Sequence, residues 1–277
     1  MAALFEFSAC PLFRWDRFQG RDLLLINHPL CQAAFSRQGG QLLHFQPRGQ
    51  RPWLWCAARW PALGAIRGGV PLCWPWFGRH PQQGGWPHHG WARLSDWQLL
   101  RQEADEQGVQ LLWCLELCDW RAELHVSLGE QLALRLVTRH ADSEACQLSQ
   151  ALHAYWNVSD VSQISLLGLD GARGEDLLLR TAFEQQGELR IVDACHRVLR
   201  QAGVLQVHDL AWQRRLHIDS GSGPNCVVWH PGSRPLNAVS WREALGFVSV
   251  QVACCGADSV TLAPGDEAVL SLRAWAS

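Results

Sequence analysis

Two arginines and two histidines lie close together in the first third of the chain, among glycines, prolines and tryptophans. They belong to the segments IRGGVPLCWPWFG, which contains Arg67, and HHGWAR, which runs from His88 and His89 to Arg93. An arginine guanidinium is a planar fork of donors that matches phosphate oxygens. An indole offers a rigid apolar face to the C–H side of a sugar, and glycine lets the backbone approach a ligand closely. The pattern indicates a pocket for a phosphorylated sugar; the alternative is a Trp- and Pro-rich core corner with two surface arginines.

A further histidine, His153, lies in the alternating stretch ALHAYWNV, which is typical of a β-strand. On a strand its imidazole would point to the face opposite Leu152. A single strand histidine is more often a satisfied core residue than a catalytic group. An imidazole with a pKa near 6.5 is nevertheless suited to give and recover a proton at neutral pH, so His153 is a candidate proton donor.

The histidines and cysteines lack the spacing of a metal site. His80, His88 and His89 have no cysteine or carboxylate at ligand spacing near them, which disfavours zinc. The eleven cysteines are scattered, include no CxxC pair and follow no secretory leader. We therefore expect reduced thiols in a cytoplasmic protein.

The composition favours neither nucleic acid nor a membrane as a partner. The 277 residues carry a net charge of −2, with 48% hydrophobic and 18% charged residues. No apolar run approaches the roughly 18 residues of a membrane span. No Pro-, Ser- or Gly-rich linker divides the chain, so we expect one domain over residues 1–277, acting as a monomer.

Period-2 alternation dominates the chain and predicts strands rather than helices. Residues 124–128 and 132–136 each place apolar side chains at alternate positions on either side of Gly129-Glu130-Gln131. If both apolar sets face one core, Leu128 must pair with Leu132 across this three-residue loop. Because convincing amphipathic helices are scarce, we expect an all-β fold, a large antiparallel β-sandwich whose concave face carries the site. Further strands are expected at 41–46, 109–117, 225–229, 246–254 and 268–274.

Five segments resemble, in order and spacing, the glucose-6-phosphate 1-epimerase branch of the aldose 1-epimerase (galactose mutarotase-like) family. They are IRGGVPLCWPWFG, HGWAR, ALHAYWNVSDV, VVWHPG and FVSVQVACCGADSVTLAPGDE, and the similarity runs from about residue 15 to the C-terminus. The resemblance implies a β-supersandwich with few short helices, which interconverts the α and β anomers of a hexose 6-phosphate without metal or organic cofactor. In such a reaction a base takes the proton of the C1 hydroxyl and an acid protonates the ring oxygen, so that the ring opens and closes on the other face.

The resemblance also implies roles for particular residues. His153 takes the position of the acid. Arg67 and Arg93 take those of the phosphate-binding residues, with His88 as an additional contact, and His89 would line the sugar site. The alternative for the two adjacent histidines is a polar loop.

Two positions depart from the family pattern. Where the family carries its basic glutamate, this chain has Gln251, whose carboxamide can hold the C1 hydroxyl but has no basic site near pH 7. Where similar proteins carry an aspartate in an Asp-Arg-Val run, this chain has His196. Asp193 could partly replace that aspartate if its loop bends, and a neutral His196 could accept the proton in place of the missing carboxylate. Whether Glu243 reaches the pocket is left open.

Three functions therefore remain. A hexose-6-phosphate mutarotase is favoured by the motif order and by His153, Arg67 and Arg93. A non-catalytic sugar-phosphate-binding or sensing protein is favoured by Gln251 and His196. A general carbohydrate-binding module explains the sixteen tryptophans but not the paired arginines.

Overall fold

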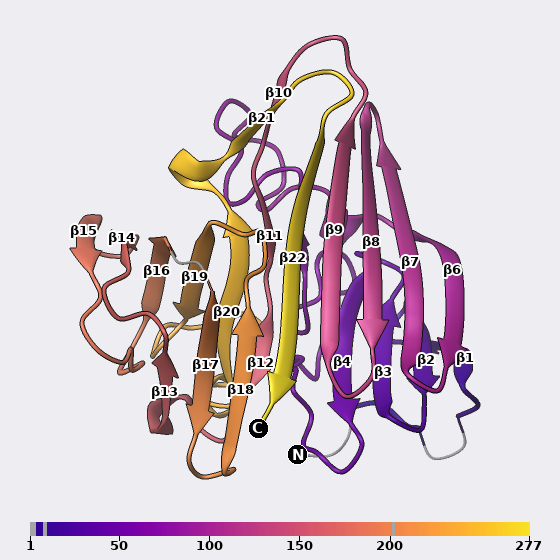
Figure 1. Cartoon of the computed structure of the whole chain (residues 1–277), viewed down its shortest axis with the longest axis horizontal. Helices are drawn as coiled ribbons and strands as arrows, with labels where there is room; N and C mark the ends of the chain where they lie inside the picture. The colour runs from indigo at the N-terminus through magenta and orange to yellow at the C-terminus, as the bar shows by residue number, and fades with distance from the viewer. Residues whose placement is uncertain (1–3, 8–9, 201–202) are drawn as a thin grey trace.

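Most strands of the protein belong to two large antiparallel sheets and a four-stranded N-terminal sheet (Figure 1). The computed structural model describes residues 4–7, 10–200 and 203–277. Sheet I comprises, in lateral order, β13 (Ile164–Leu167), β17 (Val204–Asp209), β18 (Arg214–Asp219), β22 (Glu267–Ala276), β9 (Leu132–His140), β8 (Trp120–Leu128), β7 (Gly108–Leu117) and β6 (Gln98–Asp105). Sheet II comprises, in lateral order, β15 (Thr181–Glu184), β14 (Arg173–Asp176), β16 (Cys195–Arg200), β19 (Asn225–His230), β20 (Phe247–Cys254), β11 (Gln150–Leu152) and β5 (Leu72–Cys73), with β12 (Tyr155–Asn157) also paired to β20.

The remaining elements are short or belong to the N-terminal sheet. That sheet comprises β1 (Phe13–Phe18), β2 (Arg21–Asn27), β3 (Cys31–Ser36) and β4 (Gln41–Pro47), and a separate pair is formed by β10 (Cys146–Leu148) and β21 (Val260–Leu262). The described helices are α1 (Trp241–Ala244) and the 3-10 turns η1 (Ala92–Leu94), η2 (Val161–Gln163) and η3 (Gly256–Asp258). None of the described helices is long and apolar enough to cross a membrane.

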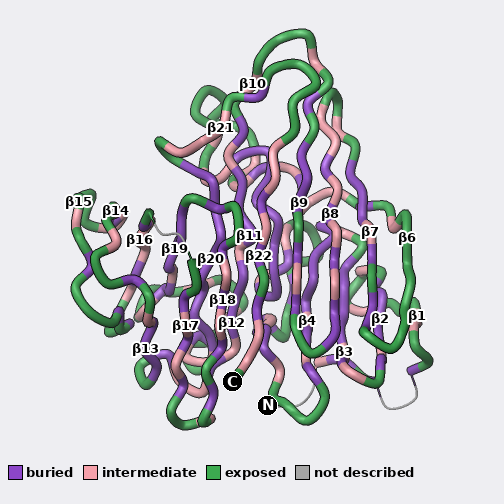
Figure 2. The backbone as a smooth tube through the Cα atoms, viewed as in Figure 1, coloured by how far each residue is buried: buried purple, intermediate pink, exposed green. Residues whose placement is uncertain are grey.

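The main core draws on all three sheets. It combines the alternating apolar residues of β8 and β9 with Leu24 and Phe35 of the N-terminal sheet and with Val250 and Val252 of β20. Figure 2 shows buried stretches along the strands and exposed residues at the turns. The odd-numbered residues of β20 point to the opposite, outer face of sheet II, where Ala253 packs in a separate cluster with Val227 of β19.

The predicted β-sandwich is confirmed, and so is the predicted hairpin. Leu128 pairs with Leu132 at the end of the β8–β9 ladder, as the parity of the apolar residues requires. Each of the other predicted strands is present as β4, β7, β19, β20 or β22, with ends that differ by at most two residues. α1, with four residues, agrees with the expectation of few short helices.

Candidate functional site

The outer face of sheet II brings His153 and Gln251 opposite each other. β11 and β12 lie on either side of His153 and pair with β20 in the same register. That register places His153 across from Gln251, where the Cβ atoms of directly opposed residues are roughly 5 Å apart. The two residues that sequence analysis assigned to acid and C1-hydroxyl contact are therefore neighbours.

His153 lies in the gap between β11 and β12 and not within a strand. Its N–H donates to the Pro71 carbonyl at 3.0 Å, which interrupts the ladder. The prediction that a strand carries this histidine was therefore wrong at this residue. The predicted side-chain direction agrees with the structure, because Leu152 is in the core while the imidazole stacks on Tyr155 at 4.9 Å and 5°.

Two buried polar atoms at this point have no hydrogen-bond partner among the described residues. They are Nε2 of His153 and Oε1 of Gln251. Gln251 is 1% exposed and His153 is half-buried. Leaving such an atom unsatisfied costs roughly 1–3 kcal/mol, so each one calls for an explanation. A ligand that carries both donors and acceptors, such as a sugar, would satisfy the two atoms together.

The contacts of His153 hold it neutral and orient it. Burial, followed by the positive charges of Arg93 and Arg67, holds its pKa well below the usual 6.5. Its Nδ1 lies 3.8 Å from Sγ of Cys73, and burial raises the pKa of that thiol to about 12. Because a protonated thiol can donate to Nδ1, this contact favours the tautomer with its proton on Nε2, the atom without a partner.

Three further histidines line a cavity whose lining does not include His153 or Gln251. His88, His89 and His196 line a cavity of about 500 Å³ that extends over β14 and β16. Nδ1 of His89 accepts a hydrogen bond from the Gly78 N–H at 2.9 Å, which leaves the ring proton on Nε2. The His88 and His89 ring centroids are 3.9 Å apart. Burial is the largest cause that lowers the pKa of each of the three; for His196 the nearby Asp176 carboxylate opposes it.

The two arginines act electrostatically on His153 and keep free donors. Nη1 of Arg67 donates to the Tyr155 hydroxyl at 3.5 Å, and Nη2 of Arg93 donates to the His88 carbonyl. Nε of Arg93 is buried without a partner among the described residues. Neither guanidinium forms an ion pair with a carboxylate in the described part of the chain. They are therefore available to an anionic ligand.

The carboxylates considered from the sequence are engaged elsewhere. Oδ1 of Asp193 accepts from the Ser233 N–H at 2.9 Å, and Oε2 of Glu243 accepts from the Ser240 N–H at 2.8 Å in the capping box of α1. Neither lines the cavity beside His88, His89 and His196. Glu175 and Asp258 do line it. Asp258, however, forms an ion pair with Arg200 at 3.0 Å, and Glu175 lies on β14, three strands from β20, at a Cα separation of about 14 Å from Gln251.

Sequence analysis missed three side chains that contact His153. Cys73 faces its Nδ1, Tyr155 stacks on its ring, and the Trp229 ring centroid lies 6.3 Å away, edge-on. A signal existed for Tyr155, because residues 153 and 155 of an alternating stretch share a face. Cys73 belongs to the motif that contains Arg67, but the sequence does not show which strand lies beside β5.

A metal would compete with existing hydrogen bonds in this cluster. Cys73, His89 and His153 offer ligand atoms within 4.8 Å of one another. The Nδ1 lone pair of His89, however, already accepts the Gly78 N–H, so ligation through either ring nitrogen would break that bond or require a second deprotonation. The arrangement fits proton exchange better than metal binding.

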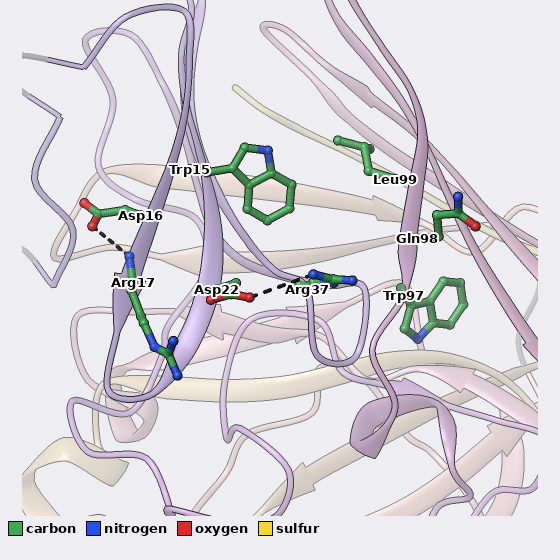
Figure 3. A pocket seen from close by; sticks show the side chains of 8 residues that line it. All are labelled: Trp15, Asp16, Arg17, Asp22, Arg37, Trp97, Gln98 and Leu99. Atoms are coloured by element: carbon green, nitrogen blue, oxygen red, sulfur yellow. Dashed lines mark hydrogen bonds and ion pairs between the residues drawn. The ribbon is translucent and has the colours of Figure 1, made fainter.

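A cavity of about 650 Å³ at the N-terminal sheet has different chemistry (Figure 3). Asp22 and Arg37 form an ion pair across it at 3.9 Å, and Nε1 of Trp97 donates to the Ala92 carbonyl at 3.0 Å. Its lining residues are Trp15, Asp16, Arg17, Asp22, Arg37, Trp97, Gln98 and Leu99. Since these eight include neither histidine nor cysteine, they do not offer the proton-exchanging groups found on sheet II.

Comparisons with known proteins point to one family. The model of the aldose 1-epimerase family matches residues 22–275. An Escherichia coli (strain K12) protein named "Putative glucose-6-phosphate 1-epimerase" is 33% identical over 236 residues, which are 80% of this chain and 78% of that protein. A protein of the same name from Salmonella typhimurium is 32% identical over 239 residues, 80% of this chain and 78% of that protein. The crystal structure of a "putative mutarotase (YeaD)" from Salmonella typhimurium superposes with a TM-score of 0.89 and 26% identity, over 98% of this chain and 95% of that chain.

Proposed function

Because the chain belongs to the aldose 1-epimerase family, we propose that it interconverts the α and β anomers of a hexose 6-phosphate by acid–base ring opening. The observation that carries this proposal is the pair of unpartnered buried atoms, Nε2 of His153 and Oε1 of Gln251, on residues that oppose each other in the sheet. A pyranose bound over them would have its ring oxygen at His153 and its C1 hydroxyl at Gln251.

The proton balance of the reaction closes without an external reagent. In its imidazolium form, His153 gives a proton to the ring oxygen, a base takes the proton of the C1 hydroxyl, the bond between C1 and the ring oxygen breaks and a C1 carbonyl forms. The carbonyl carbon then turns its other face to the freed hydroxyl. On closure that hydroxyl returns its proton to His153 and the base returns its proton to the new C1 oxygen, so both groups end as they began.

The base in this proposal is His196. Gln251 cannot take a proton near pH 7, whereas burial lowers the pKa of His196 and leaves its imidazole neutral. His196 opposes Trp229, two residues along β19 from Val227, which opposes Gln251. The Cα atoms of His196 and Gln251 are thus about 12 Å apart, a span that lets both side chains reach one hydroxyl between them.

The phosphate belongs, in this proposal, between Arg67 and Arg93. Both guanidiniums lack a carboxylate partner among the described residues, and the unpartnered Nε of Arg93 supplies a donor for a phosphate oxygen. His88 adds a contact at the rim, and His89, with its proton on Nε2, donates to a sugar oxygen. The free state of all eleven cysteines supports placing this activity in a reducing cytoplasm.

Anomer exchange of glucose 6-phosphate, measured by saturation-transfer NMR, tests the proposal. We expect exchange faster than in buffer, reduced about 10²-fold or more in His153→Asn because general acid catalysis is worth that much. The matched control is His217→Asn, a half-buried histidine on β18 of sheet I, which should exchange at the wild-type rate. Wild-type and His153→Asn proteins with equal rates would refute the assignment of the acid.

A second candidate is a sugar-phosphate-binding protein without turnover, which the amide at position 251 favours. The variant Gln251→Glu separates the two functions. If the wild type exchanges no faster than buffer while Gln251→Glu exchanges rapidly, the chain is a binder with a mutarotase architecture. If the wild type already exchanges rapidly, the enzyme assignment stands. Calorimetry compares the binding of glucose 6-phosphate with that of glucose. We expect the protein to recognise the phosphate in either case.

A further inference from the structure

The surroundings of His153 oppose the protonation that its role requires. The groups that act on it electrostatically are the cations Arg93 and Arg67, followed by His196 and His88, and His89 lies with its ring centroid 5.7 Å away. Its other neighbours are the neutral thiol of Cys73, the neutral phenol of Tyr155, the indole of Trp229 and the amide of Gln251, described above. None of these groups carries negative charge.

We propose that the phosphate of the substrate activates the site: bound at Arg67 and Arg93, it cancels their charge and lets His153 take up, from solvent, the proton that it delivers to the ring oxygen. This inference rests on the proposed function, and it assigns the two arginines a role in turnover in addition to binding.

Geometry supports this coupling. Arg67 donates to the Tyr155 hydroxyl, and the Tyr155 ring stacks on the imidazole of His153 at 4.9 Å. The Tyr155 side chain therefore connects the Arg67 guanidinium to His153. Arg93 holds the carbonyl of His88, whose ring adjoins that of His89. Charges this close to a half-buried group are only partly screened by water, so replacing two net positive charges by near neutrality must favour the imidazolium.

Because residue 251 is an amide and not a carboxylate, this chain depends on its ligand for the negative charge that would stabilise the His153 imidazolium. A carboxylate opposite His153 would stabilise the imidazolium from within the protein, but the amide does not. The phosphate is then the anion that compensates the two arginines. A free hexose can occupy the same sugar site, yet it would meet a neutral His153, so its deficit should lie in kcat and not only in KM.

The test supplies the phosphate separately from the sugar. Anomer exchange of glucose is measured by saturation-transfer NMR with and without saturating inorganic phosphate, alongside glucose 6-phosphate. We expect inorganic phosphate to accelerate exchange of glucose at least tenfold in the wild type and in Arg17→Met, an exposed arginine of the other cavity. Activation should disappear in Arg93→Met and return in part in Arg93→Lys, which keeps the charge.

A direct measurement on the imidazole accompanies the rate. The His153 ring is assigned by its loss in His153→Asn and titrated by NMR with and without inorganic phosphate. We expect phosphate to raise its midpoint by about one pH unit or more, which corresponds to tenfold more imidazolium at neutral pH. An unchanged midpoint together with unchanged or slower glucose exchange overturns the inference, even if glucose 6-phosphate is a good substrate. If the protein exchanges no hexose 6-phosphate at all, the proposed function is wrong instead. The titration then still shows whether bound phosphate raises the pKa of His153.

Discussion

At His196 the surroundings of the imidazole keep it able to accept a proton. It lines the same cavity as His88 and His89, and burial lowers its pKa while Asp176 opposes this effect. We expect His196→Asn to reduce kcat for glucose 6-phosphate about 10²-fold or more, the usual contribution of a general base, with KM changed little.

The replacement His196→Asp separates a basic role from a structural one. An aspartate restores a group that can accept a proton, so its kcat should exceed that of His196→Asn. The pH–rate profile should also change, because the limb at low pH would then report a carboxyl group and not an imidazole. Equal activity of wild type and His196→Asn would remove His196 from the proton pathway and leave solvent as the acceptor.

At the scale of elements, the sequence predicted the features that follow from the alternation of apolar and polar residues, which are the strand positions and the register of one hairpin. The parity of apolar residues determined the β8–β9 register, because a shift by one residue would turn every leucine away from the core. The gap at His153 was not predictable in this way, since it depends on a hydrogen bond to Pro71, a residue about eighty positions earlier. The strand order of sheet II likewise joins β11 to β5, and no local pattern shows that such distant segments pair.

The turn at Gly90 restrains the segment that carries His88 and His89. Gly90 has φ +75°, and an added Cβ would lie 2.0 Å from the Trp74 carbonyl oxygen, whereas Gly49 has the same φ with nothing within 4 Å. Gly49→Ala should therefore lose only about 1 kcal/mol of unfolding free energy, the cost of an alanine in the left-handed region. Gly90→Ala adds a backbone overlap and should lose about 3 kcal/mol or more.

Urea unfolding of both variants measures this difference, and anomer exchange should fall in Gly90→Ala alone, because His89 and Trp91 flank the turn. Equal losses in the two variants would mean that the turn relaxes freely. The sequence could place a glycine in this motif, but not the carbonyl that makes it necessary.

At the scale of the whole molecule, the site exists only when the fold assembles it. Its groups come from the loop of Arg67 and the turn of His88 to Arg93 in the first third of the chain, from the gap at His153, and from two strands of sheet II in the last third. Order and spacing of the motifs led to the prediction of which residues take part, and that assignment stays a prediction. The electrostatic character of the site was not predictable, because it arises from burying several imidazoles beside two guanidiniums that have no carboxylate partner in the described part of the chain.

This assembly should make the protein sensitive to mild acid. Burial lowers the pKa of His88, His89, His153 and His196 in the folded state, whereas in the unfolded chain each binds a proton below about pH 6.5. Protons therefore favour the unfolded state, and the free energy of unfolding falls as the pH drops below 6.5, by about 1.4 kcal/mol per pH unit for each histidine that stays neutral when folded.

Urea unfolding between pH 7 and pH 5 measures that slope, in a range above the carboxyl titrations. His153→Asn, which removes one such imidazole, should flatten it by up to about 1.4 kcal/mol per pH unit, while Arg17→Met should leave it unchanged. A slope near zero in the wild type would mean that the histidines take up protons without unfolding the protein. In that case the cluster would already accommodate positive charge, and phosphate would have little left to compensate at His153.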